Sequence, residues 1–298
     1  MKRSAGASPC TREEHEMSKV NLYIAEVKKL EDPALYAAAF ARMPKERQEK
    51  TARLRMQADR LRSVGAWMLL EQGMSLHGIG REELILSYGP YGKPDLADRI
   101  SGGADHKADR SPDRPLPTGD ALLQSRTDVH FNLSHAGKFV LLAVSDRPVG
   151  CDVEEIRPIN DALARRFLTD GEQMLLQTAF ADEIVSCEVF REAREEQSAE
   201  CLPEAERLIR IWTRKESVLK MTGLGMRLDL RDLVVWPEFD AEADAPRSEL
   251  TKEELAFWRT HLPDWKRTYR FSDFAVGNCR AACFGAAQAE RLNFLELF

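Results

Sequence analysis

The pattern of apolar and polar positions divides the first part of the chain into strand and helix segments. Strand-like patterns predict a strand over Asn21–Val27 and a shorter one over Leu84–Tyr88. Between them, helices are expected over Pro33–Met43 and Pro44–Met74, the second broken near Ala58. Each helix begins with a proline, which is tolerated in a first turn because the N–H that it lacks has no intrahelical partner there.

The middle of the chain is predicted to form three consecutive strands. The first two, His130–His135 and Phe139–Ser145, are separated by the short segment 136–138, Ala-Gly-Lys, which suits a hairpin. A third strand is expected over Val149–Ile156 and is ended by Pro158.

The rest of the chain is predicted to alternate between helices and a second set of strands. A long helix is expected from about Glu204 to Met221, where Gly223 and Gly225 stop it. The remaining elements are helices over about Asp161–Leu168 and Gly171–Phe180 and strands over Val234–Trp236, Trp265–Phe271 and Phe274–Ala286.

Each half of the chain runs from strand to helices to strands, which predicts an α+β fold built from two α/β subdomains. The expected division is a disordered leader at 1–18, an N-terminal subdomain at 19–147 and a C-terminal subdomain at 148–298. Two segments, Ile100–Asp120 and Ala181–Glu206, are expected to be surface insertions, because the first is rich in Gly, Pro and Asp and the second is strongly acidic.

Composition narrows the class of protein. Of the 298 residues, 43% are hydrophobic, which is enough for a core, and the net charge of −6 argues against non-specific nucleic-acid binding. The sequence contains no apolar run long enough to span a membrane, and its polar N-terminus lacks the apolar core of a secretion signal. The cysteines at 10, 151, 187, 201, 279 and 283 form no Cys-x-x-Cys pair, so we expect free thiols in a reducing cytoplasm.

Three carboxylates and one lysine are the leading candidates for chemistry. Glu216 and Lys220 lie four residues apart on a predicted helix and therefore on one face. Asp152 and Glu154 lie two apart on a predicted strand and also share a face. Such a set suits a hard divalent cation held against a phosphate. A solvated helix pair and an exposed strand edge explain the same spacings, and both alternatives stay open.

Weaker candidates lie elsewhere. His135 follows Ser134 at a strand end, Arg47 and Lys50 share one helix face, and the turn Tyr91–Pro94 could lay its backbone against a flat base. A merely hydrogen-bonded histidine and a solvent-facing basic pair are the plainer interpretations. The chain contains no P-loop, dinucleotide-binding glycine motif or nucleophile elbow.

Four motifs, in order, resemble those of the 4′-phosphopantetheinyl transferases of the surfactin-synthetase type. Val149–Glu154 is similar to the family pattern Val-Gly-x-Asp-x-Glu, and Trp212–Lys220 is similar to Trp-Ser/Thr-x-Lys-Glu-Ser/Ala-x-x-Lys. Phe131–His135 and Tyr91–Pro94 also look like family motifs. The resemblance implies a single-chain fold of two similar α/β subdomains related by a pseudo-twofold axis.

The resemblance also implies an activity. An enzyme of this family, holo-[acyl-carrier-protein] synthase type (EC 2.7.8.7), moves the phosphopantetheine arm of coenzyme A to a serine of an apo acyl or peptidyl carrier protein and releases 3′,5′-ADP. The reaction depends on Mg²⁺, with Mn²⁺ as an alternative. Together with the composition, these features lead us to expect a cytoplasmic monomer that binds neither nucleic acid nor membranes.

Residue roles carry over by motif. Asp152, Glu154 and Glu216 would bind the metal, Glu216 would also be the base for the incoming serine, and Lys220 would contact the pyrophosphate, so that Asp152, Glu216 and Lys220 form the catalytic set. The remaining coenzyme A contacts would be His135, Arg47, Lys50 and Ser63 at the 3′-phosphate and Tyr91, Gly92, Lys93, Pro94 and Ser134 at the adenine end.

The chain departs from the family pattern in two respects: more residues than usual separate Asp152 from Glu216, and Ile100–Asp120 is a second insertion. The excess is expected in Ala181–Glu206, which should lie away from the basic surface that an acidic carrier requires. Two other functions fit the residues less well and stay open. One is a non-catalytic regulator that binds coenzyme A or a nucleotide, and the other is a Mg²⁺-dependent phosphodiesterase that releases free phosphopantetheine.

Overall fold

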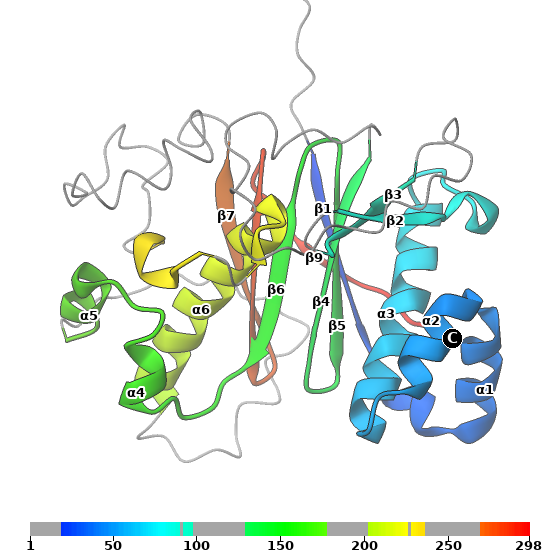
Figure 1. Ribbon diagram of the computed structural model, residues 1–298, viewed down its shortest axis with the longest axis horizontal. Coiled ribbons are helices and arrows are strands. Elements are labelled where there is room, and N and C mark those ends of the chain that lie inside the picture. Colours follow the sequence, from blue (N-terminus) through cyan, green and yellow to red (C-terminus); the bar gives the residue numbers. More distant parts are fainter. Residues whose placement is uncertain (1–18, 90–91, 98–128, 178–201, 226–227, 236–268) are drawn as a thin grey trace, which may run out of the picture.

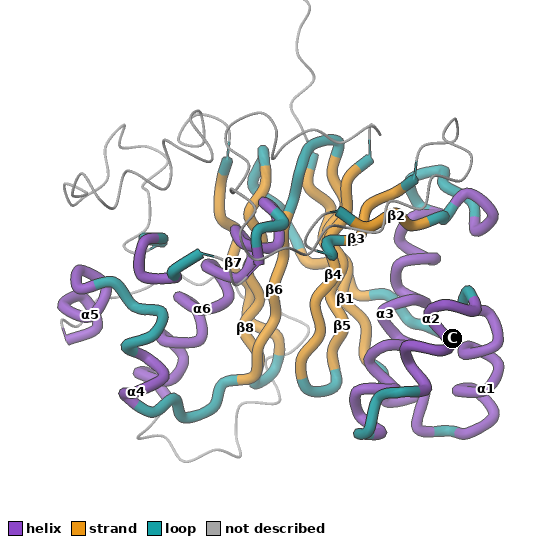
Figure 2. Tube along the Cα trace, viewed as in Figure 1, coloured by secondary structure: helices purple, strands orange, loops and turns teal. Residues whose placement is uncertain are grey.

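A computed structural model describes residues 19–89, 92–97, 129–177, 202–225, 228–235 and 269–298. The strands stand at the centre of the molecule, with one group of helices on each side (Figures 1 and 2). This mixed arrangement confirms the predicted α+β class.

The first sheet consists of β1 (Val20–Glu26), β4 (His130–Ala136), β5 (Phe139–Ser145) and β9 (Leu292–Phe294). Their order across the sheet is β4-β5-β1-β9. β1 pairs antiparallel with β5 and parallel with β9. The last strand of the chain therefore extends the sheet that the first strand begins.

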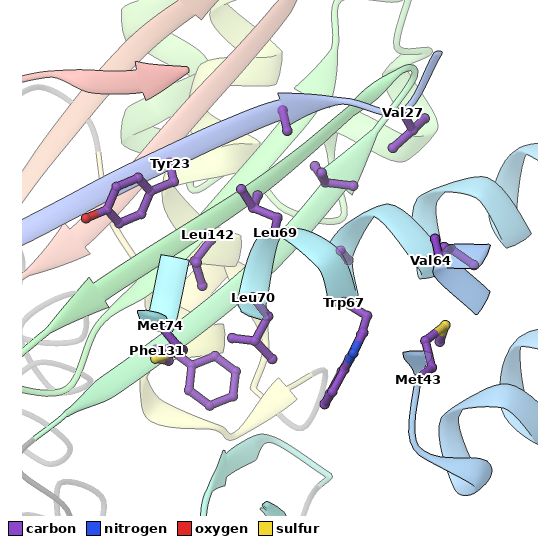
Figure 3. Close-up of a cluster of buried hydrophobic side chains, with 14 of the residues drawn as sticks. Tyr23, Val27, Met43, Val64, Trp67, Leu69, Leu70, Met74, Phe131 and Leu142 are labelled. Carbon is purple, nitrogen blue, oxygen red and sulfur yellow. The ribbon is translucent and has the colours of Figure 1, made fainter. Parts of the chain in front are cut away.

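Helices cover one face of this sheet. They are α1 (Pro33–Arg42), α2 (Lys45–Ala52) and α3 (Gln57–Ser75). Alternate residues of β1 point to opposite faces, so Tyr23 and Ala25 pack against the helices while Leu22 and Ile24 point away from them. Figure 3 shows the resulting core, in which Trp67 of α3 lies among aliphatic and aromatic side chains. A short hairpin of β2 (Leu86–Tyr88) and β3 (Pro94–Leu96) follows α3 in the chain.

The second sheet consists of β6 (Gly150–Glu155), β8 (Cys279–Gly285) and β7 (Arg270–Val276), in that order. Among the described residues of this half, the helices are α4 (Asp161–Ala164), α5 (Asp170–Gln177) and α6 (Leu202–Thr222). α6 packs on the sheet, and its buried apolar residues share a core with Phe284 of β8.

A third core joins the two sheets. Leu22 and Ile24 of the first sheet share it with Cys151 and Val153 of β6. The molecule is therefore built in four layers, with helices, two sheets and helices in succession (Figure 1). The inner faces of both sheets are apolar and exclude water, so the two halves are packed together through their strands.

The two halves follow the same path. In each, a first strand is followed by helices and then by a hairpin, and the first strand pairs antiparallel with the second strand of that hairpin. Both hairpins turn at a glycine with positive φ, Gly137 at 51° and Gly277 at 55°. Glycine suits these turns because its missing Cβ removes the steric penalty of the left-handed region.

Most predicted elements are confirmed within a few residues, but the last part of the chain was divided wrongly. The expected break between Phe271 and Phe274 falls inside β7, and the real turn lies at Gly277. Two consecutive polar residues inside the strand interrupt the apolar pattern, which is why a break was expected there. Ser272 accepts a hydrogen bond from the amide of Ala289 at 2.8 Å, and Asp273 pairs with Arg214 of α6.

Other boundaries also differ. Residues 234–235 form no strand, because the amide of Val235 donates to the Glu172 carboxylate at 3.0 Å instead of to a neighbouring strand. The break between α2 and α3 lies at 53–56 rather than near Ala58, and α4 ends at Ala164 instead of Leu168. β3 and β9 were not predicted.

Several predictions fall outside the described residues. They are the leader at 1–18, the insertion Ile100–Asp120, the part of Ala181–Glu206 that precedes α6, and the residues Tyr91, Trp236, Cys10, Cys187 and Cys201. The described cysteines, 151, 279 and 283, are free and buried, as expected. Within the described part of the chain, no helix is both long and apolar enough to cross a membrane.

Candidate active site

Gly150 explains why the two best motif segments lie together. A Cβ at position 150 would overlap the carbonyl oxygen of Ser217 and lie 2.5 Å from the amide nitrogen of Met221. Glycine is therefore required for the backbone of α6 to approach β6 this closely. Because Asp152 and Glu154 share a strand face with Gly150, their carboxylates are placed against α6.

The opposite side of α6 is fixed by the buried Lys215. Its Nζ donates to the carbonyl oxygen of Phe167 and, at 2.8 Å, to that of Leu230, and it pairs with Glu172 at 2.7 Å. Buried charges are tolerated when they are paired and hydrogen-bonded in this way. The contacts anchor the helix at the residue immediately before Glu216, so the direction of that side chain is set by packing.

Asp152 is the centre of the candidate site. It is buried on β6, and its Oδ1 accepts hydrogen bonds from Lys220 Nζ at 2.6 Å and from Ser134 Oγ at 2.8 Å. Lys220 also donates to Ser134 Oγ at 2.8 Å. Side chains from β4, β6 and α6 therefore meet at one point, at the seam between the two halves.

The side chains of β4 also satisfy the free edge of β6. Asn132 Oδ1 accepts the amide of Cys151 at 3.0 Å, and Ser134 Oγ accepts the amide of Val153 at 3.3 Å. These backbone groups would otherwise be buried without a partner, which costs about 1–3 kcal/mol each. The bridges fix β6 against β4 and thereby fix the position of Asp152.

Glu154 and Glu216 lie close enough to Asp152 to interact electrostatically with it. Burial raises the pKa of Glu216 to about 7; the charges of Asp152 and Glu154 add to this effect and that of Lys220 opposes it. Burial and the Asp152 charge also raise the pKa of Glu154, and a hydrogen bond with Trp212 opposes the rise. Mutual repulsion of this kind is expected where carboxylates converge without a compensating cation.

The carboxylate set fits a divalent cation in its chemistry. The second carboxylate oxygen of Asp152, Oδ2, is buried and accepts no hydrogen bond in the described part of the chain. An unsatisfied buried carboxylate oxygen next to two further carboxylates is the kind of donor that Mg²⁺ takes. Among the described residues, however, no three such side chains are already arranged as a closed ligand cluster.

His135 lies at the end of β4, beside two cations. Partial burial lowers the pKa of its imidazole, and the charges of Arg62 and Lys220 lower the pKa further. Arg62, on α3, is held by Asp59 and donates from Nη1 to the carbonyl oxygen of Gly137 at 2.9 Å. The neighbouring positive charges make this end of the strand attractive to an anion.

The predicted basic pair of α2 faces aromatic rings. Arg47 stacks over Trp67 at 5.4 Å from the ring centroid, and Lys50 lies 4.4 Å from the centroid of Tyr88. Lys50 also pairs with Glu46 at 3.0 Å. Both cations therefore have local partners, and within the described part of the chain these partners lie apart from Asp152.

Ser63 lies one residue after Arg62 on α3. Its hydroxyl shares a 2.6 Å hydrogen bond with that of Thr51 at the end of α2. This contact holds α2 and α3 together, and Ser63 directly follows Arg62, whose charge acts on His135.

The turn before β3 is described from Gly92 onward. Gly92 has φ of +85° and donates its amide to the carbonyl oxygen of Gly89 at 2.9 Å. Lys93 does not point into open space, because its Nζ donates to the carbonyl oxygen of Met221 at 2.7 Å. Pro94 begins β3, which is held by β2.

Asn132 and Arg62 were missed by the sequence reasoning. Asn132 belongs to the quoted segment Phe131–His135, and its alternation with Ser134 on β4 was a usable signal for two side chains on one face. Arg62 carried no local signal, because its contact with the Gly137 turn joins residues 75 apart in sequence.

Comparison with known proteins identifies the class. Residues 148–279 match the 4′-phosphopantetheinyl transferase superfamily. This match covers β6, α6 and β7, so it contains all three carboxylates and Lys220. The family that the motifs resemble is therefore the one whose model matches this part of the chain.

Individual relatives are found in several bacteria. The chain is 33% identical to the 4′-phosphopantetheinyl transferase psf-1 of Bacillus pumilus, over 42% of this chain and 45% of that protein. It is 29% identical to the 4′-phosphopantetheinyl transferase Sfp of Bacillus subtilis, over 38% and 41%. It is 36% identical to the 4′-phosphopantetheinyl transferase AcpT of Salmonella typhimurium, over 37% and 51%. The matched part spans about half the length of these relatives or less.

Proposed function

We propose that this protein transfers the 4′-phosphopantetheine group of coenzyme A to a serine of an apo acyl or peptidyl carrier protein and releases 3′,5′-ADP. The observation that carries this proposal is the meeting of Asp152, Glu154, Glu216 and Lys220 at the contact of β6 with α6. The superfamily match over the same residues and the activity named for the relatives support it.

Glu216 is the proposed base. Without metal the pKa of Glu216 is raised to about 7, and a bound cation would lower it, so the carboxylate would be ionised and able to take a proton, as general-base catalysis requires. The serine hydroxyl oxygen attacks the phosphorus of the pantetheine phosphate and gives its proton to Glu216. The bond from that phosphorus to the bridging oxygen then breaks, and 3′,5′-ADP leaves with the electron pair.

Lys220 is the proposed pyrophosphate contact. Its ammonium is shared between Asp152 and Ser134, at a point where a phosphate oxygen could replace either partner. Asp152, Glu154 and Glu216 would hold Mg²⁺, or Mn²⁺, which when bound offsets the negative charge of the pyrophosphate. The unsatisfied Oδ2 of Asp152 supports this assignment.

The remaining coenzyme A contacts extend from this point into the first half. His135, with Ser63 as a weaker candidate, is proposed at the 3′-phosphate, and the charge of Arg62 beside His135 supports that choice. Arg47 and Lys50 complete this set, and the backbone of the turn Tyr91–Pro94 is proposed at the adenine end.

We also infer that the two halves are related by a pseudo-twofold axis and that the protein works as a cytoplasmic monomer. The common path of strand, helices and hairpin supports the first inference. Packing of the two sheets within one chain supports the second. Three buried free thiols are compatible with a reducing compartment.

Intact-mass analysis of carrier proteins tests the function. The chain is incubated with coenzyme A, Mg²⁺ and apo carriers of the fatty-acid and peptide-synthetase types, and the expected result is a carrier heavier by one phosphopantetheine. Asp152→Asn should abolish the mass shift, whereas Asp161→Asn, at an exposed helix position, should leave it unchanged. Binding of coenzyme A without transfer to any carrier would refute the proposal in favour of a regulator. Release of free phosphopantetheine without a carrier would indicate a phosphodiesterase.

A further inference from the structure

Lys93 crosses from the first half of the molecule to the end of α6. It lies between β2 and β3, directly before Pro94, and its Nζ donates to the carbonyl oxygen of Met221 at 2.7 Å. Its methylene stem lies against Gly223, where an added Cβ would meet Lys93 Cδ at 3.2 Å. The contact joins residues 128 apart in sequence, so it is purely tertiary.

The carbonyl of Met221 is a group that needs such a partner. The last four carbonyl groups of a helix have no intrahelical donor, and a cation near this end is favoured by the helix dipole. α6 ends at Thr222, and the following Gly223 has φ of +71° and donates its amide to the carbonyl oxygen of Leu219 at 2.9 Å. Lys93 therefore acts as a C-terminal cap supplied by a distant segment.

Lys93 is packed rather than freely mobile. Burial lowers the pKa of its ammonium to about 8, and the charge of Asp95 opposes this shift only in part. A lysine on an open turn would keep its head in water and would not lose hydration in this way. The side chain therefore belongs to the packing between the hairpin and α6.

Met221 directly follows Lys220 in the last turn of α6. The same turn is pressed against Gly150 of β6, so its position is set from two sides, by β6 and by Lys93. We propose that Lys93 is a positioning residue that holds the last turn of α6 against the β2–β3 hairpin and thereby directs Lys220 toward Asp152 and Ser134. We call this contact of Lys93 with Met221 the latch. The effect of the latch on catalysis rests on the transferase function proposed above, whereas its existence does not.

This role differs from direct contact with coenzyme A, which the family resemblance implies for Lys93. A ligand contact would mainly set the affinity for coenzyme A. A positioning contact acts through the direction of Lys220, so it should lower kcat more than it changes the binding of coenzyme A. The two roles also differ without any ligand, because only the latch should change the dynamics of α6.

The test compares Lys93→Met, which keeps the stem and removes the donor, with Lys93→Arg, which keeps a cationic donor. Lys19→Met, at an exposed position just before β1, is the matched control. Amide hydrogen exchange is measured for residues 219–223, the dissociation constant of coenzyme A is measured by calorimetry, and kcat is measured with one apo carrier. Lys93→Gln replaces Lys93→Met if circular dichroism shows that the latter does not fold.

In Lys93→Met we expect exchange in the last turn to be roughly 3- to 10-fold faster, the range that one lost hydrogen bond produces. We expect kcat to fall about tenfold while the dissociation constant of coenzyme A changes less than about twofold, with Lys93→Arg restoring most of both kcat and protection. Exchange equal to that of Lys19→Met would overturn the latch. A tenfold weaker coenzyme A affinity at unchanged kcat would assign Lys93 to the ligand instead. If no carrier is modified even by the unaltered protein, the proposed function fails, and exchange still decides whether the latch exists.

Discussion

Adding a single carbon at position 150 should separate the two segments that build the active site. In Gly150→Ala, the new methyl group would meet the carbonyl oxygen of Ser217 and the backbone of Met221. Both contacts are with the main chain of α6, so no side chain can rotate away to make room. The helix as a whole has to move away from β6, and Glu216 and Lys220 move with it.

The size of the effect follows from the distances. The Ser217 carbonyl oxygen would lie 1.9 Å from the new Cβ, whereas ordinary contact begins near 3.4 Å, so α6 has to retreat by roughly 1.5 Å. Overpacking of this kind destabilises a protein by about 1–3 kcal/mol. A 1 Å misplacement of catalytic groups lowers the rate by about 100-fold. At temperatures where the variant remains folded, the rate should therefore still fall by about this factor, because the misplaced groups act in every turnover of the folded protein.

Two measurements separate these effects. Urea unfolding gives the loss of stability, and carrier mass analysis at a temperature where the variant is fully folded gives the rate. Gly80→Ala is the matched control, because Gly80 has φ of −72° and its added Cβ would meet only the mobile carboxylate of Glu82. A Gly150→Ala variant with full activity and stability within about 0.5 kcal/mol of the unaltered protein would refute the role of Gly150.

Three further predictions concern the groups around Asp152. Asn132→Ala leaves the buried amide of Cys151 unpaired and should lower the free energy of unfolding by about 1–3 kcal/mol in urea titrations; no loss would mean that β6 does not depend on this bridge. The pKa of Glu216 rises from 4.5 to about 7 on folding, so without metal the native state holds a proton that the unfolded chain has lost between these pH values. The free energy of unfolding should therefore fall as pH rises through this window. The fall is at most about 3 kcal/mol, and it is smaller than that because the side chain is partly exposed. Denaturation at several pH values measures this dependence, and Glu216→Gln should flatten it. Finally, Mg²⁺ at about 100 times its dissociation constant should raise the free energy of unfolding by about 2.7 kcal/mol, and an equal rise in Asp152→Asn would contradict the proposed ligand set.

The sequence predicted those helices and strands whose apolar spacing and end signals lie within the element itself. β1, β4, β5 and α6 were found within about two residues, because apolar spacing and helix-ending glycines are local signals. β9 gave no such signal. It has only three residues, and its pairing with Leu22 to Ile24 joins the two ends of the chain. β7 was misdivided because Ser272 and Asp273 are polar for tertiary reasons, each satisfied by a distant partner.

The site was predictable only as two separate faces. Spacing places Asp152 and Glu154 on one side of a strand and Glu216 and Lys220 on one side of a helix. Whether the two faces meet depends on Gly150, whose importance is visible only when α6 lies on β6. Only the resemblance to a family implied that the two faces meet. In the structure they meet through the ion pair of Lys220 with Asp152.

The position of this site at the seam between the halves has a physical consequence. Ser134 comes from the first sheet, Asp152 from the second and Lys220 from α6, and all three share one hydrogen-bonded cluster. A small shift of one half against the other would therefore break contacts at the reacting centre as well as disturb the apolar core between the two sheets. Asn132 and Lys93 each join the halves by a hydrogen bond next to this cluster. Each of these two hydrogen bonds contributes only about 1 kcal/mol to folding. Their larger effect is to orient the side chains of the cluster, because a misdirected Lys220 slows every turnover.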